Sequence, residues 1–313
     1  MTTSAVLPLP PTAGEGRGEG SSILAVFSLI RYRFFLYAGL LPYLLGAAWA
    51  RSMEGAFLPG RFWLGLVGIF LSVCGVEAFN EYYDARMGTD RVFNPSDDET
   101  IPEWMWAFGV TAFALAAACG VTLAWEAGWP ILIYAALGGL AAAFYVGPPI
   151  RWVYRGLGET MIGLSYGPWM TLGSVQLHTG RFSPGALAAS LVPGLLITSL
   201  AVVNAIPDFH QDRLVGKRNL VVRLGRRGGA FLYLGLAAAG LLVLLGGAAA
   251  GVFPRGALLA AAAAAPLLVL SGRTGLVHYD EPRRFIPAVK WVVLSYVAAT
   301  GAFILALLLR GRA

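Results

Sequence analysis

Two carboxylate-rich motifs stand out in a chain that has few charged residues. Each begins with Asn, has an Asp four residues later, and has a further Asp beyond it. The six residues are Asn80, Asp84 and Asp90 in the first motif, and Asn204, Asp208 and Asp212 in the second. Side chains four residues apart share one face of a helix, so each Asn is predicted to lie beside the Asp that follows it. Asp212 continues that spacing from Asp208, whereas Asp90 returns to the face only if the chain turns near Gly88.

These residue types favour a hard metal ion. Carboxylates gathered at a membrane surface repel one another, and burying them without a counter-charge costs several kcal/mol each. All six side chains offer oxygen donors, with no cysteine or paired histidine beside them, which favours Mg²⁺ over zinc. Mg²⁺ commonly bridges one or two carboxylates to phosphate oxygens, so a diphosphate is the predicted third partner. Solvated loop acids are the alternative, and the repetition of the motif in register argues against it.

Cationic residues are predicted to lie on the same membrane face as the two motifs. A loop rich in Gly and Pro runs from Tyr145 and presents Arg151 and Arg155, and the segment after Asp212 presents Arg213 and Lys217. The planar guanidinium fork of Arg suits a diphosphate. Positively charged residues also anchor the cytoplasmic ends of membrane helices, so both interpretations stay open for these four side chains.

The elements that position these residues are predicted to be membrane helices. Of 313 residues, 57% are hydrophobic and 13% are charged, about half the usual charged share of a soluble domain. Apolar stretches of roughly 20 residues recur, which is the length that crosses a bilayer. The alternating pattern of a membrane barrel is absent. The composition therefore predicts an all-α, polytopic membrane protein.

The chain is predicted to form one membrane domain after a short tail. Residues 1–22 are rich in Pro, Gly and Ser and are expected to form a disordered cytosolic tail, followed by a single transmembrane domain over 23–313. About nine spans are expected. They cover 34–50, 62–80, 104–125, 130–146, 158–177, 186–206, 230–252, 257–270 and 286–309.

The distribution of charge predicts the orientation. With these spans, sixteen of the 23 Lys and Arg residues fall on the face of the two motifs and six on the other, while Lys290 lies in the last span. The excess places the motifs at the cytoplasmic face, most simply of the cell (inner) membrane. The net charge of +6 is thereby explained by topology, and no nucleic-acid partner is expected.

The spacing of the motifs indicates an internal repeat. Asn204 follows Asn80 by 124 residues, and four predicted spans separate them, so both motifs emerge on one face. Two similar four-helix units in parallel orientation would make the acidic helix ends face each other across a central cavity.

At these residues the sequence resembles the UbiA superfamily of intramembrane prenyltransferases, in particular its dihydroxynaphthoate polyprenyltransferases of menaquinone biosynthesis. The resemblance rests on the paired motifs, on the loop from Tyr145 through Gly147-Pro148, on Gly156-Leu-Gly158-Glu159, and on Gly216-Lys217. It departs from that branch at Glu81, at Pro207, which is expected to kink the sixth helix, and in the segment after Arg91.

The resemblance implies transfer of a polyprenyl group from an allylic diphosphate to an aromatic quinone precursor, with release of diphosphate. The four Asp residues, with Asn80 and Asn204, are then the catalytic Mg²⁺ site. Tyr145, Arg151, Arg155, Arg213 and Lys217 are the implied substrate contacts. The donor, the acceptor and membrane lipid are the expected partners.

Two other interpretations remain at this point. The departures leave open a non-quinone acceptor, such as a chlorophyll-type or glycerol-phosphate lipid. Intramembrane acids between repeats also mark the ion pathways of cation-coupled transporters. Here the acids gather at one face and not at the midplane, which favours the enzyme.

Overall fold

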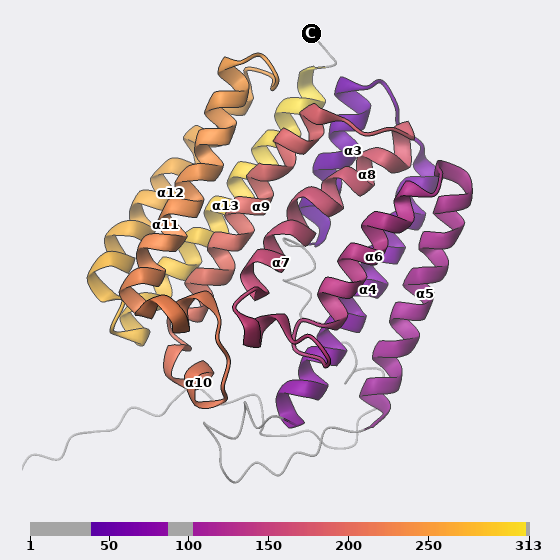
Figure 1. The fold of residues 1–313 in the computed structure, drawn as a ribbon. Coiled ribbons are helices and arrows are strands. Elements are labelled where there is room, and N and C mark those ends of the chain that lie inside the picture. Colours follow the sequence, from indigo (N-terminus) through magenta and orange to yellow (C-terminus); the bar gives the residue numbers. More distant parts are fainter. Residues whose placement is uncertain (1–38, 87–102, 311–313) are drawn as a thin grey trace, which may run out of the picture.

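The computed structural model describes residues 39–86 and 103–310, and for Asp84 and Ala85 it describes the backbone alone. The predicted tail, the start of the first span, Asp90 and the segment after Arg91 lie outside the described residues. In the described ranges every regular element is helical (Figure 1). The elements are α3 Leu41–Met53, α4 Pro59–Arg86, α5 Trp104–Ala127, α6 Pro130–Ala143, η3 Trp152–Arg155, α7 Gly158–Leu164, η4 Ser165–Trp169, α8 Met170–Thr179, α9 Pro184–Ala205, α10 Phe209–Leu214, α11 Leu220–Ala249, α12 Ala257–His278 and α13 Pro282–Arg310.

Local sequence explains where several helices begin and end. Pro184 occupies the first turn of α9, where the missing N–H costs nothing, and the Ser183 side chain accepts a hydrogen bond from the Ala186 backbone. Asn219 caps α11 in the same way through the Val222 N–H at 2.8 Å. Gly180, with φ of 70°, ends α8 in the left-handed conformation that glycine adopts without strain.

Within residues 39–86 and 103–310, six helices are long and apolar enough to cross a membrane, namely α4, α5, α9, α11, α12 and α13. The protein is therefore an integral membrane protein, as its composition predicts. Helix α6 is apolar but shorter, and the predicted fifth span is divided between α7, η4 and α8. The number of nine crossings is not settled by helix length and stays a prediction.

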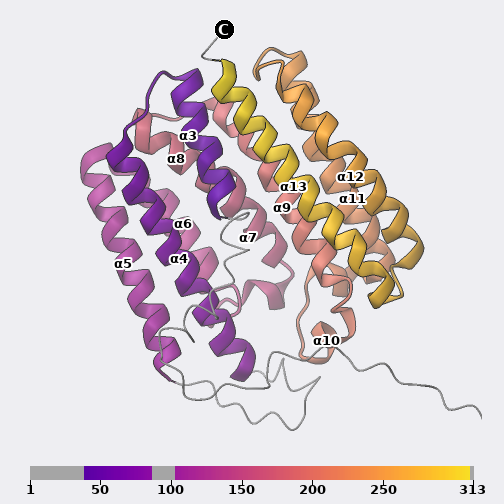
Figure 2. The same cartoon turned by 180° about the vertical axis from the view of Figure 1, so that it is seen from behind.

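Helix α9 lies at the centre of the bundle and packs against α3, α7, η4, α11 and α13 (Figures 1 and 2). Its Val192, Leu196 and Val203 are fully buried in the main core. The approach to η4 is close enough to require glycine on both sides. A Cβ added at Gly167 would lie 2.5 Å from the Cα of Gly194.

The predicted fifth span is not a continuous α-helix. Its middle, Ser165–Trp169, is a π-helical turn that contains Pro168. Proline has no N–H and its ring crowds the preceding turn, so the α-helical hydrogen-bond ladder is interrupted there. This π-helical turn between α7 and α8 forms part of the wall of the site described below.

The second motif also departs from the helix that its spacing predicts. Helix α9 ends at Ala205, a turn covers Ile206 to Asp208, and α10 begins at Phe209. The expectation that Asn204 shares one continuous helix face with Asp208 and Asp212 is therefore wrong, whereas Asp208 and Asp212 stay one turn apart, since the Asp212 N–H donates to the Asp208 carbonyl at 2.9 Å. Pro207 accounts for the break, because it cannot donate the backbone hydrogen bond that a continuous helix needs.

Candidate active site

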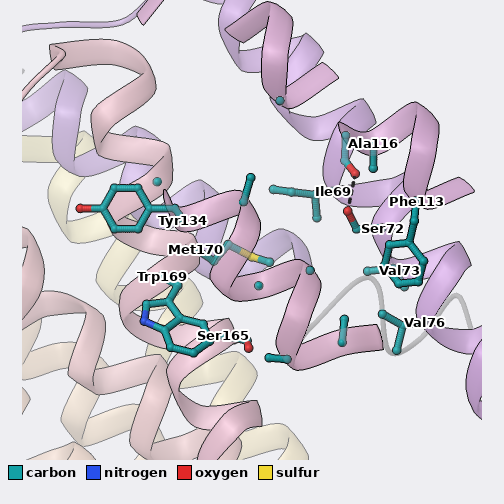
Figure 3. Close-up of a pocket in the computed structure, with 18 of the residues that line it drawn as sticks. Ile69, Ser72, Val73, Val76, Phe113, Ala116, Tyr134, Ser165, Trp169 and Met170 are labelled. Atoms are coloured by element: carbon teal, nitrogen blue, oxygen red, sulfur yellow. Dashed lines mark hydrogen bonds between the residues drawn. The ribbon is translucent and has the colours of Figure 1, made fainter. Parts of the chain in front are cut away.

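A large cavity opens between α4, α5, α6 and the α7–η4–α8 segment. Its volume is about 1360 Å³. Ile69, Val73 and Phe113 face it from α4 and α5, and Tyr134 and Trp169 face it from α6 and η4 (Figure 3). We call it the α4–α8 cavity. A space of this size inside the apolar part of a membrane protein is suited to a lipid-like ligand.

The α4–α8 cavity has a polar end and an apolar end. Asn80 and Asn204, the first residues of the two motifs, line the polar end together with Tyr145. The apolar wall continues along α4 as far as Gly65 and along α8 as far as Leu177. Gly65 and Asn80 are 15 residues apart on one helix, which corresponds to about 22 Å at the usual rise. The cavity thus joins a polar head site to a long apolar channel.

Asn80 carries an unsatisfied acceptor at the polar end. Its Oδ1 is buried and accepts no hydrogen bond within the described ranges. Such an atom costs about 1–3 kcal/mol unless a ligand supplies a partner. Asp84 follows one turn later in α4, and the two positions share a helix face. An amide oxygen beside a carboxylate position fits a hard cation such as Mg²⁺.

The acids of the second motif lie beyond the cavity wall, in the turn and in α10. Partial burial raises the pKa of the Asp208 carboxyl, and the Lys217 ammonium opposes that rise. Asp212 is buried, and its Oδ2 accepts a 2.6 Å hydrogen bond from Asn219. Lys217 Nζ lies 3.8 Å from Asp212 Oδ1, with both side chains 12% exposed. Lys217 is therefore held beside the motif.

No group of three or more His, Cys, Asp or Glu residues forms a ready metal cluster among the described residues. Asp90 and the Asp84 side chain fall outside that description, so half of the predicted four-carboxylate set is not placed. The break at Pro207 also separates Asn204 from Asp212. The described members of the predicted set, Asn80, Asn204, Asp208 and Asp212, all offer oxygen donors and fit Mg²⁺ by chemistry.

Hydrogen bonds join the loop after α6 to the segment before α11, at the end of the bundle where α10 lies. The Arg223 guanidinium donates to the Arg155 carbonyl, and the Arg218 N–H donates to the Val153 carbonyl at 3.3 Å. Glu159, only 3% exposed, accepts a 2.9 Å hydrogen bond from the Leu220 N–H through Oε1. These contacts join the loop after α6 to the start of α11. They fix the position of the cationic segments relative to the cavity.

The predicted cationic side chains do not all lie at the cavity. Arg151, Arg155 and Arg213 are exposed, and none of them lines the cavity. Arg151 adopts φ of 55° and lies over the Tyr154 ring at 6.0 Å. Of the predicted set, the structure brings Asn80, Asn204 and Tyr145 to the lining of the α4–α8 cavity and Lys217 to Asp212.

Sequence reasoning missed Glu77 and Tyr166, which both line the cavity. Glu77 precedes Asn80 by three residues in α4, so its place on the same helix face could have been read from the spacing. Tyr166 lies in the π-helical turn, and nothing in the local pattern predicts that its side chain faces the cavity.

Comparison with known proteins identifies the family. The model of the UbiA prenyltransferase family matches residues 39–294. A 1,4-dihydroxy-2-naphthoate octaprenyltransferase of Mycobacterium tuberculosis is 30% identical over 222 residues, covering 66% of this chain and 74% of the relative. The Bacillus subtilis protein of the same name is 23% identical over 160 residues. That match covers 49% of this chain and spans about half of the relative, 51% of its length.

Solved structures share the fold. A UbiA homologue from Aeropyrum pernix matches with a TM-score of 0.63 and 18% identity, covering 88% of this chain and 98% of that one. An Archaeoglobus fulgidus homologue bound to DMAPP and Mg²⁺ matches with a TM-score of 0.57 and 15% identity, with the same coverage of both chains. The family model spans most of the chain and confirms the resemblance seen in the motifs. The chain therefore belongs to the UbiA prenyltransferase family and is a membrane prenyltransferase.

Proposed function

We propose that this enzyme transfers a polyprenyl group from an allylic diphosphate to an aromatic quinone precursor of the dihydroxynaphthoate type. The observation that carries the proposal is the α4–α8 cavity, which joins the Asn residues of both motifs to a long apolar channel. A prenyl diphosphate has the same division into a charged head and an apolar tail. The names of the Mycobacterium and Bacillus relatives support the naphthoate acceptor.

Mg²⁺ is the proposed metal ion. Asp84, Asp90, Asp208 and Asp212 would hold it, with the amide oxygens of Asn80 and Asn204 as further ligands. When bound, Mg²⁺ neutralises charge on the diphosphate and so favours its departure. The unsatisfied Oδ1 of Asn80 supports this donor set, as does the Archaeoglobus homologue that binds DMAPP and Mg²⁺.

The protein's own side chains bind the substrates and protect the reaction. Lys217, held beside Asp212, supplies a positive charge for diphosphate oxygens, and Arg151, Arg155 and Arg213 surround the same end of the bundle. The ring faces of Tyr145 and Tyr166 offer negative potential to the allylic cation. The apolar walls keep water away from that cation, so the electron-rich acceptor ring reacts with it instead.

The proposal includes a topology. Helices α3, α6 and the α7–η4–α8 segment would complete nine crossings, with the two motifs in parallel four-helix units that open to the cytoplasm. The excess of Lys and Arg on the face of the motifs supports this orientation. The cell membrane then supplies the apolar donor from within the bilayer.

Purified enzyme given Mg²⁺ and an allylic diphosphate is expected to release diphosphate when a dihydroxynaphthoate is added. Mass spectrometry of the lipid extract should detect the prenylated ring. A panel of acceptors tests the alternative, because a chlorophyll-type or glycerol-phosphate acceptor that reacts faster than every naphthoate would overturn the acceptor assignment. Absence of a covalent product with every acceptor would contradict the proposed transfer.

Replacement of Lys217 by Met is expected to raise the KM for the allylic diphosphate about tenfold, because a charge-assisted contact to diphosphate oxygens is lost. Donor saturation curves at fixed Mg²⁺ measure this effect. Arg227→Met is the matched control, since Arg227 lies in α11 at the same end of the bundle but contacts the Phe231 ring. Equal KM values for the two variants would show that Lys217 serves topology alone.

A further inference from the structure

A second concave site lies between α12 and α13, far from the α4–α8 cavity. The groove has a volume of about 720 Å³ and is lined by Arg273, Thr274, Val277, His278, Arg284 and Pro287. Helices α12 and α13 lie side by side on the side of the bundle opposite α5 (Figures 1 and 2). The groove is near their connection, at the end of the bundle where α10 lies. We call it the α12–α13 groove.

Arg273 lies on a strongly exposed, apolar face of α12. Val269 and Val277, four residues before and after it, are 54% and 69% exposed. In a membrane helix such side chains face lipid, so Arg273 emerges among acyl chains about one and a half turns before α12 ends at His278. Its guanidinium forms no hydrogen bond or ion pair with any described residue. A cation at this depth requires an anionic partner or a path to the headgroup layer.

The facing wall adds positive charge. Arg284, in the first turn of α13, lies 3.1 Å from the Glu281 carboxylate, and the same carboxylate lies 3.2 Å from His278. The Glu281 carboxylate therefore serves Arg284 and His278, and among the described residues no acid lies within ion-pair distance of Arg273. Pro287, three residues after Arg284 in the same helix, also lines the groove. The groove thus combines a cationic base with apolar flanks.

We propose that the α12–α13 groove binds the headgroup phosphate of an anionic phospholipid. Two arginines offer forked donors that match phosphate oxygens. The exposed Val277, one turn after Arg273 on the same face of α12, provides apolar surface for acyl chains, which a free phosphate ion would not use. The position at the end of transmembrane helices is where the headgroups of a bilayer lie.

The test compares lipids that differ in headgroup charge alone. The full-length protein is stripped of lipid in detergent and titrated with phosphatidylglycerol or phosphatidylcholine of equal chain length, and bound lipid is counted by native mass spectrometry. Phosphatidylglycerol is expected to bind more tightly. Arg273→Gln and Arg284→Gln should each raise its Kd about fivefold, as expected for loss of one cation near a lipid headgroup. Arg273→Lys, which keeps the charge, should lose less than Arg273→Gln.

Arg255→Gln is the matched control. Arg255 is exposed and lies just before the first residue of α12, at the opposite end of that helix from Arg273. Its replacement therefore removes the same charge from the other membrane face. This variant should bind phosphatidylglycerol as the wild-type protein does. Equal affinity for the two lipids, or an equal effect of Arg255→Gln and Arg273→Gln, would overturn the proposal. Thermal unfolding of each variant without lipid verifies that the fold is intact.

Discussion

Asp84→Asn and Asp208→Asn are each expected to lower the rate of prenyl transfer by about 100-fold or more. Each change keeps the shape of the side chain and removes the negative charge that Mg²⁺ prefers in a ligand. Loss of a metal ligand weakens charge neutralisation on the departing diphosphate, which supplies several kcal/mol of the stabilisation of the transition state. Product formation measured across a Mg²⁺ titration reports both the rate and the apparent affinity for the metal ion.

Asp280→Asn is the control for these variants. Asp280 is an exposed acid in the connection between α12 and α13, so its loss changes the charge near the same membrane face without touching the motifs. Its activity and Mg²⁺ requirement should match those of the wild-type protein. If Asp84→Asn and Asp208→Asn both keep full activity, the metal-binding role of the motifs is wrong.

Gly138→Leu is expected to lower transfer from a twenty-carbon donor by about 100-fold, with a much smaller loss for a five-carbon donor. Gly138 lines the α4–α8 cavity, and a Cβ added there meets no atom within 4 Å. The new side chain therefore grows into the space proposed for the prenyl tail and not into a neighbouring helix. Overfilling a fitted apolar site typically costs about 1–3 kcal/mol, which corresponds to about 5-fold to 150-fold in binding.

Gly235→Leu separates this effect from a general change in the helix. A Cβ at Gly235 also meets no atom within 4 Å, but this residue is exposed on α11 and lines no part of the α4–α8 cavity. It should leave the preference for donor length unchanged. If Gly138→Leu lowers activity equally with donors of both lengths, the tail does not occupy the cavity beside α6.

Membrane helices and the family could be read from the sequence because they depend on local properties. Composition and the length of apolar stretches decide whether a segment crosses a bilayer, and both are visible without the fold. The Asn-initiated motifs likewise identified two of the residues that line the cavity, Asn80 and Asn204, and the loop pattern identified Tyr145. Family membership was then confirmed over residues 39–294.

Periodicity failed where proline changed the backbone. Spacing alone predicted one helix face for Asn204, Asp208 and Asp212, whereas the chain breaks between α9 and α10. The same residue type lies in the π-helical turn between α7 and α8. In both places the missing N–H of proline removes a backbone hydrogen bond that a regular α-helix contains.

The sequence by itself determined that this protein is a helical membrane prenyltransferase with two oxygen-rich motifs, because hydrophobicity, charge and motif spacing are properties of the chain. Only the tertiary structure decided which side chains meet. It placed Tyr166 in the cavity lining, held Lys217 beside Asp212, and left Arg151 and Arg155 outside the lining. Such contacts depend on how separate helices and loops pack against one another, and no local pattern encodes that packing.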